Sequence, residues 1–215
     1  MMDETRVDSY IESLGSPAPA YLEELAKSAG SAGIPIIRPP MRDFLRTIIL
    51  MHGPMTILEI GCAVGFSALY MREYAPEECR ITTIENYEPR IAEAKANFAK
   101  YDPDSRIRLI EGDAVEIVKC LGEAFDLIFM DGPKGQYINM YEDIKRLLPP
   151  GGVLISDNIL QEGDILESRY AVTRRDRTIH SRMRDYLYKL THDEDYSTSI
   201  VPLADGASLS VRLGT

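Results

Sequence analysis

The chain contains little cysteine and no long hydrophobic run. Its three cysteines, Cys62, Cys79 and Cys120, form an odd set whose spacings match neither a zinc site nor a disulfide framework. Because unpaired cysteines are typical of reducing compartments, we expect a cytoplasmic protein. No stretch approaches the ~18 consecutive apolar residues of a membrane-spanning helix. Residues 1–8 are largely polar and acidic, which is unlike a secretory signal. We therefore expect no membrane association.

The chain also lacks a basic net charge. Its formal charge of −10 argues against a protein that coats nucleic acid with its whole surface. The segment of residues 168–190, called the arginine segment below, is the exception. It has two interpretations: a local site for an anionic partner, or a solvated helix face partly paired with acidic neighbours. Its basic residues are Arg169, Arg174, Arg175, Arg177, Arg182, Arg184 and Lys189, opposed only by Asp176 and Asp185.

Length and composition indicate one α/β domain. The 215 residues are 45% hydrophobic and 27% charged, as in ordinary globular proteins. We expect a single domain over residues 1–215, with an N-terminal helical segment at 1–52 and the core at 53–215. Apolar spacing and glycine or proline breakers predict helices at 7–14, 21–29 and 41–51, with an extended stretch at 34–40.

From residue 56 onward, strand and helix patterns alternate. Short apolar runs predict strands at 56–60, 80–84, 106–110, 125–130 and 153–156, and helical periodicity fills 67–74, 89–100, 114–121 and 137–148. This alternation predicts a mostly parallel sheet with helices on both faces. Two further strands, 197–203 and 207–213, meet across Asp205-Gly206, which is a hairpin signal. The expected sheet therefore has seven strands and ends in an antiparallel hairpin.

A glycine turn follows the first strand. Gly61 and Gly65 would let the backbone turn sharply and approach a ligand. Ala63 stands where a dinucleotide fingerprint has its second glycine, which weakens a pyrophosphate-binding interpretation. A tight strand-to-helix turn without a ligand is the alternative.

Acidic side chains end the next two strands. Glu85 could accept hydrogen bonds from both hydroxyls of a ribose. Asp113 could accept from an adenine amino group, or it could cap the helix that follows. Since ligands of open parallel sheets bind beyond the carboxyl ends of the strands, these residues together with Gly61 and Gly65 indicate an adenosine-containing ligand.

Oxygen-bearing side chains also end the fourth and fifth strands. Asp131, Asp157 and Asn158 would form a hard-cation site suited to Mg²⁺, Mn²⁺ or Ca²⁺, because no cysteine or histidine accompanies them. The alternative is that they are turn formers. Lys134 lies three residues beyond Asp131. A nearby cation would lower the pKa of its amine and make it a usable base.

These residues resemble those of the cation-dependent O-methyltransferases related to catechol and caffeoyl-CoA methyltransferases. The resemblance covers residues 34–212 and implies a Rossmann-like class I methyltransferase fold that uses S-adenosylmethionine, with Mg²⁺ holding the hydroxyl that is methylated. It implies that Asp131, Asp157 and Asn158 bind the metal, that Lys134 is the general base, and that Asp131 also takes part in catalysis and borders the cofactor. The implied cofactor contacts are Glu59, Gly61, Gly65 and Ser67 around methionine, Glu85 at the ribose, and Asp113 with Ala114 near adenine.

Within that family, the chain resembles the bacterial tRNA 5-hydroxyuridine methyltransferases, which make 5-methoxyuridine at the wobble position. The similarity lies in residues 10–13, 134–137 and 201–206 and in the arginine segment. It implies a tRNA substrate and a homodimer, with phosphates held by Arg174, Arg175, Arg177, Arg182 and Arg184. His180 is expected to stack on a base or to be a surface histidine without a role. Gly132-Pro133 departs from many relatives and bears on how Lys134 is presented.

Two rival functions remain open. One keeps the chemistry but methylates a small catechol or an acyl-linked phenol, which the acidic net charge favours. The other is a nucleotide-binding dehydrogenase or a non-catalytic adenosine-binding protein. Ala63 in the turn and the Asp157-Asn158 pair argue against this second rival.

Overall fold

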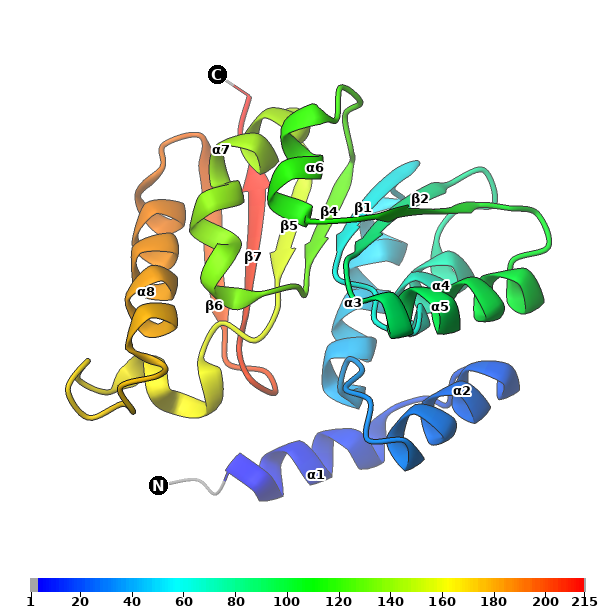
Figure 1. Ribbon diagram of the computed structural model, residues 1–215, viewed down its shortest axis with the longest axis horizontal. Coiled ribbons are helices and arrows are strands. Elements are labelled where there is room, and N and C mark those ends of the chain that lie inside the picture. Colours follow the sequence, from blue (N-terminus) through cyan, green and yellow to red (C-terminus); the bar gives the residue numbers. More distant parts are fainter. Residues whose placement is uncertain (1–3, 215) are drawn as a thin grey trace.

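The computed structural model describes residues 4–214, and these residues form a three-layer α/β fold (Figure 1). The strands are β1 (Thr56–Ile60), β2 (Arg80–Glu85), β3 (Ile107–Glu111), β4 (Leu127–Met130), β5 (Val153–Ser156), β6 (Tyr196–Val201) and β7 (Ala207–Arg212). The α-helices are α1 (Glu4–Leu14), α2 (Ala20–Ser31), α3 (Pro39–His52), α4 (Phe66–Tyr74), α5 (Glu88–Tyr101), α6 (Ala114–Cys120), α7 (Tyr137–Leu147) and α8 (Arg177–His192). Two 3₁₀ helices, η1 (Lys134–Gln136) and η2 (Gln161–Leu166), follow β4 and β5.

The described strands form one seven-stranded sheet in the order β3-β2-β1-β4-β5-β7-β6. β1 to β5 are parallel, and β7 runs antiparallel between β5 and β6. The strand order reverses beside β1, where a crevice opens at the carboxyl ends of β1 and β4. The sheet confirms the expected fold class, including the C-terminal hairpin.

Alternating side chains of the central strands supply two separate cores. Ile57 and Phe129 pack on one face with α2 to α5, whereas Leu58 and Met130 pack on the other face with α6 to α8. Figure 1 shows these two helical layers on either side of the sheet. Because both faces are covered, β4 and β5 are almost wholly apolar, as is typical of parallel strands, and β1 is apolar except for Thr56 and Glu59.

Helix α3 begins next to the crevice for local reasons. Pro39 and Pro40 occupy its first turn, where a missing amide hydrogen costs nothing. Proline also holds the preceding residue extended, and Arg38 has φ −69° and ψ 153°. The helix ends at Gly53 in the left-handed conformation. The prolines therefore fix the backbone of Arg38, at the end of the stretch 35–38 that lines the crevice.

The expected elements occur within two residues of their expected bounds, except that α1 begins three residues earlier than expected. Helix α8 is the main element for which the sequence set no bounds. The hairpin connection is also longer than a two-residue turn, because β6 ends at Val201 and β7 begins at Ala207. No helix among the described residues is both long and apolar enough to cross a membrane. All three cysteines are unpaired.

Candidate active site

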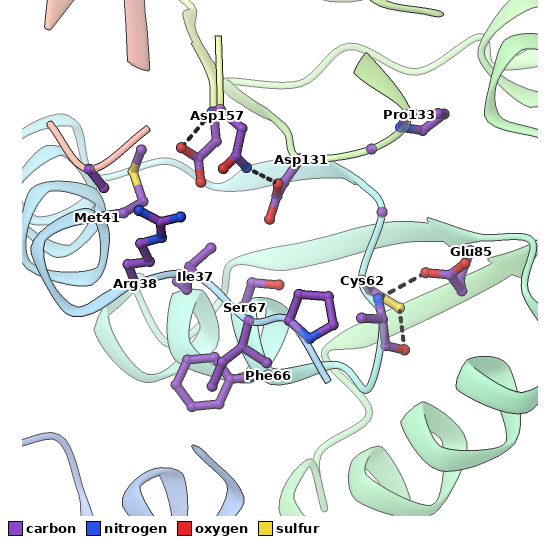
Figure 2. Close-up of a pocket in the computed structure, with 17 residues that line it drawn as sticks. Ile37, Arg38, Met41, Cys62, Phe66, Ser67, Glu85, Asp131, Pro133 and Asp157 are labelled. Atoms are coloured by element: carbon purple, nitrogen blue, oxygen red, sulfur yellow. Dashed lines mark hydrogen bonds between the residues drawn. The ribbon is translucent and has the colours of Figure 1, made fainter. Parts of the chain in front are cut away.

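A cavity of about 360 Å³, called the main cavity below, opens at the carboxyl ends of β1, β4 and β5 (Figure 2). One wall is the extended stretch of residues 35–38 with Met41. The floor is the turn after β1 and the residues that follow β4 and β5. Six residues expected in the site line it: Gly61, Ser67, Glu85, Asp131, Asp157 and Asn158. The structure thus brings together residues that are nearly one hundred positions apart in the sequence.

The turn after β1 depends on Gly61. Its φ is +89°, and a Cβ there would lie 2.7 Å from the carbonyl oxygen of Asp131. Only glycine allows β1 and β4 to approach so closely at this point. Glu85 braces the same turn: its Oε2 accepts from the amide of Ala63 at 2.8 Å. Its Oε1 accepts from the amides of Asn86 and Tyr87. The Glu85 carboxylate is therefore fixed at the edge of the cavity.

Glu59 lies within β1 beneath the cavity and is fully buried. The Thr83 hydroxyl donates to its Oε2 at 2.5 Å. Its Oε1 has no hydrogen-bond partner among the described residues. Burial raises the pKa of Glu59 to about 7. A buried acceptor that lacks a partner is suited to a ligand that brings a donor.

Asp131 and Asp157 follow paired residues of neighbouring strands, since Met130 of β4 is in register with Ser156 of β5. Asp157 is only 4% exposed. Burial raises the pKa of Asp157 to about 6. Burial first, and then repulsion from Asp157, raises the pKa of Asp131 well above its usual value. The floor of the cavity therefore holds two carboxyl groups that a cation would stabilise.

Asn158 completes this cluster. Its φ of +58° is in the left-handed region, which asparagine tolerates better than most residues. Its side-chain amide donates to Asp131 Oδ1 at 2.8 Å, and its backbone amide donates to Asp157 Oδ1 at 2.7 Å. Among the described residues, Asp131 Oδ2, Asp157 Oδ2 and Asn158 Oδ1 accept no hydrogen bond. Three oxygens of one cluster thus remain available.

Lys134 opens η1 beside the cluster and lies outside the lining of the main cavity. Its Nζ is 3.4 Å from Asp205 Oδ2, and both residues line a neighbouring side cavity of about 220 Å³. Asp205 is 5% exposed and also accepts from the amide of Glu162. Lys134, which directly follows Gly132-Pro133, is thus paired with Asp205 in the loop between β6 and β7.

The remaining expected cofactor residues lie outside the lining of the main cavity. Asp113 caps the N-terminus of α6, which was the alternative to an adenine contact. Its Oδ1 accepts from the amide of Val115 at 2.8 Å. Ala114 begins the same helix. Gly65 has φ +81°, and a Cβ there would lie 2.5 Å from the Phe98 ring. The absence of a side chain at Gly65 therefore lets Phe98 of α5 pack against this turn. The structure leaves the cofactor roles of these residues as predictions.

The arginine segment spans an exposed loop and most of α8. Arg177 contacts the Tyr170 ring, and Arg182 donates to the carbonyl of Gly135 next to Lys134. Lys189, by contrast, pairs with Glu142. Acidic pairing within the segment is therefore partial, as the solvated-face interpretation expects, because none of its six arginines forms an ion pair within residues 4–214. These are Arg169, Arg174, Arg175, Arg177, Arg182 and Arg184.

The surface position expected for His180 is wrong. This side chain is 2% exposed, on the buried face of α8 with Met183 and Tyr186. Its Nε2 lies 3.1 Å from the carbonyl oxygen of Glu167. One ring nitrogen therefore reaches a backbone carbonyl, while Nδ1 is buried without a hydrogen-bond partner among the described residues.

Sequence reasoning missed two residues near the site. Arg38 lines the main cavity, and Asp205 holds Lys134. The sequence indicated only a turn former at Asp205, because Asp-Gly is so common in hairpins. For Arg38, the Pro39-Pro40 pair was a usable signal, since it fixes the backbone from which the side chain projects.

The fold and cavity define the Rossmann-like methyltransferase class. An SAH-bound methyltransferase of Podospora anserina superposes with a TM-score of 0.88 at 26% identity, covering 100% of this chain and 97% of that one. The O-methyltransferase family model matches residues 12–213. The catechol O-methyltransferase of Niastella koreensis is 30% identical over 75% of this chain and 76% of its own length. That of Mycobacterium tuberculosis is 31% identical over 74% of each chain.

The chain belongs to the O-methyltransferase family. It is an S-adenosylmethionine-dependent O-methyltransferase of the catechol and caffeoyl-CoA type. The dehydrogenase and non-catalytic alternatives are thereby excluded.

Proposed function

We propose that the enzyme uses a divalent cation, best fitted by Mg²⁺, and that its acceptor is 5-hydroxyuridine at the wobble position of tRNA, giving 5-methoxyuridine. The observation that carries the metal is the buried Asp131–Asp157 pair with three oxygens left free. The arginine segment beside Lys134 supports the RNA acceptor.

The cofactor would extend over the turn after β1. Glu85 is held in place by three backbone amides and would receive the ribose hydroxyls. Asp113, Ala114 and Gly65 would border the adenosine half. The unpartnered Oε1 of Glu59 would accept from the ammonium group of the methionine half, with Ser67 beside it.

The chemistry of the donor set fits a hard divalent cation. Two carboxylates and one amide oxygen leave room for water and acceptor oxygens around Mg²⁺, which usually keeps several non-protein ligands. Mn²⁺ and Ca²⁺ prefer the same donors. No group of three histidine, cysteine or acidic side chains able to hold a metal occurs among the described residues. The set therefore depends on the Asn158 amide, as expected from the sequence.

Bound S-adenosylmethionine would supply the methyl group: a carbon–oxygen bond to the acceptor would form, the carbon–sulfur bond would break, and S-adenosylhomocysteine and the hydroxyl proton would be released. A bound divalent cation lowers the pKa of a hydroxyl that it contacts and fixes its position. Asp131 would help to hold the cation. Lys134 could receive the hydroxyl proton at Nζ only as a neutral amine, so its contact with Asp205 must first break and its ammonium must first lose a proton to water. Positioning of the two reactants supplies much of the rate.

The acceptor is inferred from charge. Six arginines without carboxylate partners form a local positive surface on an otherwise acidic protein, which is typical of a phosphate-binding surface. Arg174 and Arg175 lie in the exposed loop, and Arg182 reaches the Lys134 loop. A single-stranded RNA loop bound there could place one base in the main cavity. Such enzymes act as homodimers in the family that the sequence resembles, and we propose a dimer here.

A small phenol is the second candidate acceptor. Two relatives that cover about three quarters of the chain are named catechol O-methyltransferases. Under this alternative the arginine segment is a solvated face.

Labelled methyl transfer from S-adenosylmethionine distinguishes the two acceptors. We expect label in tRNA that carries unmethylated 5-hydroxyuridine and little label in catechol. Label in catechol alone would reject the RNA acceptor and keep the metal mechanism. Label in neither would reject both acceptors.

A further inference from the structure

Arg38 is a cation at the rim of the main cavity to which the proposed reaction gives no role. Its backbone is fixed between buried Ile37 and the Pro39-Pro40 start of α3. The side chain is exposed, and Figure 2 shows it extending along the cavity wall toward Asp157 and Asp131. Among residues 4–214, the Arg38 guanidinium makes no ion pair and no hydrogen bond. Its five donors therefore face the cavity opening without partners.

The position of Arg38 separates it from the cofactor. The proposed contacts to ribose and methionine lie at the Gly61, Glu59 and Glu85 end of the cavity. Arg38 lies at the other end, near Asp157 and away from Glu85, where the acceptor hydroxyl would enter (Figure 2). Lys134, the other cation near this end, is paired with Asp205. Arg38 is thus the cation that lines the main cavity on the acceptor side.

We propose that Arg38 binds an anionic group of the acceptor, a phosphate or a carboxylate next to the ring that carries the reacting hydroxyl. The inference rests on the proposed methyl-transfer site. A guanidinium suits this task because its planar donors match both anions in a bidentate manner. Arg38 lines the main cavity, whereas no residue of the arginine segment does, so it is a separate contact that selects the acceptor at the cavity itself.

The test compares charged and neutral acceptors of equal ring chemistry. One pair is 5-hydroxyuridine and its 5′-monophosphate; the other is catechol and 3,4-dihydroxybenzoate. For Arg38→Gln we expect KM for the charged member of a pair to rise about tenfold, as for loss of one exposed charged hydrogen bond. We expect kcat, KM for the neutral member and KM for S-adenosylmethionine to stay unchanged. Arg38→Lys should recover part of the loss.

Arg108→Gln is the matched control, because Arg108 is an exposed arginine of β3 paired only with Glu123. A selective effect on the nucleotide pair would identify phosphate as the ligand, and one on the benzoate pair would identify carboxylate. Equal effects on both members of a pair, no effect, or a change in KM for S-adenosylmethionine would overturn the proposal.

Calorimetric titration of the enzyme–SAH complex with the same four compounds separates this proposal from the proposed function. If the parent binds the anionic compounds more tightly than the neutral ones, Arg38→Gln loses this preference, and no compound is methylated, the inference stands and the proposed acceptors are rejected. Turnover without any Arg38 dependence would reject the inference and keep the proposed function.

Discussion

Gly61→Ala should damage both the stability of the fold and cofactor binding. The left-handed φ of +89° costs an alanine ~1–2 kcal/mol. The added Cβ would also lie 2.7 Å from the Asp131 carbonyl oxygen and 2.9 Å from Gly132 Cα. These are backbone atoms, so β4 must move, which adds ~2 kcal/mol in line with overpacked cores. The movement displaces Asp131 from the cavity floor.

Gly151→Ala isolates the contribution of that contact. Gly151 has a φ of +84°, similar to that of Gly61, but a Cβ there meets nothing within 4 Å. Both variants therefore carry the backbone strain, and only Gly61→Ala carries the clash. A chain of this size loses ~3 °C in Tm per kcal/mol. The Tm of Gly61→Ala should accordingly lie roughly 6 °C below that of Gly151→Ala.

Thermal denaturation and calorimetric binding of S-adenosylmethionine measure the two effects. We expect Gly151→Ala to bind the cofactor as the parent does and Gly61→Ala to bind it at least about tenfold more weakly, which is ~1.4 kcal/mol. Equal Tm values and equal affinities for the two variants would refute the account of the β1–β4 approach.

Three further predictions concern Glu59, the arginine segment and α2. The raised pKa of Glu59 means that the folded state keeps a proton between pH 4.5 and about 7, where the unfolded chain has lost it. The unfolding free energy without cofactor should therefore fall as pH rises through this window. Denaturant titrations at several pH values measure it, and a Glu59→Gln variant whose unfolding free energy falls with pH as steeply as that of the parent would refute this. Arg174→Gln/Arg175→Gln should reduce the salt slope of RNA binding by ~1.4, at ~0.7 per lost single-strand phosphate contact, in filter-binding assays; an unchanged slope would mean that these side chains touch no phosphate. Gly30→Ala, exposed in α2 with free space around its Cβ, should raise the unfolding free energy by ~0.5–1 kcal/mol; a loss of stability would show that this glycine is needed.

The sheet could be predicted from the sequence because strands buried on both faces are continuous apolar runs between clear breakers. β1 and β5 have their expected bounds. Gly61, Glu85, Asp131 and Asp157 could be placed together because parallel strands all end at one edge of the sheet. The likeness to known O-methyltransferases then assigned the chemistry.

The residues that escaped prediction act through contacts distant in sequence. The buried face of α8 contains His180 and Tyr186, which hydropathy treats as polar, so no helix bounds followed from the pattern. The pairing of Lys134 with Asp205 joins residues 71 positions apart through the C-terminal hairpin. The Pro39-Pro40 pair indicates the extended backbone at Arg38, but the packing of residues 35–38 along the cavity depends on contacts distant in sequence.

The central claim is that Asp131, Asp157 and Asn158 bind the divalent cation that methyl transfer requires. The most direct test follows labelled methyl transfer in Mg²⁺ and in EDTA for the parent enzyme and for Asp157→Ala. The account predicts that EDTA lowers the parent rate ~10³-fold or more, since a bound cation contributes several kcal/mol, and that added Mg²⁺ restores it. Asp157→Ala should be inactive in both conditions while binding S-adenosylmethionine normally. A parent enzyme that keeps its rate in EDTA, or an Asp157→Ala variant with near-normal activity, would contradict the claim.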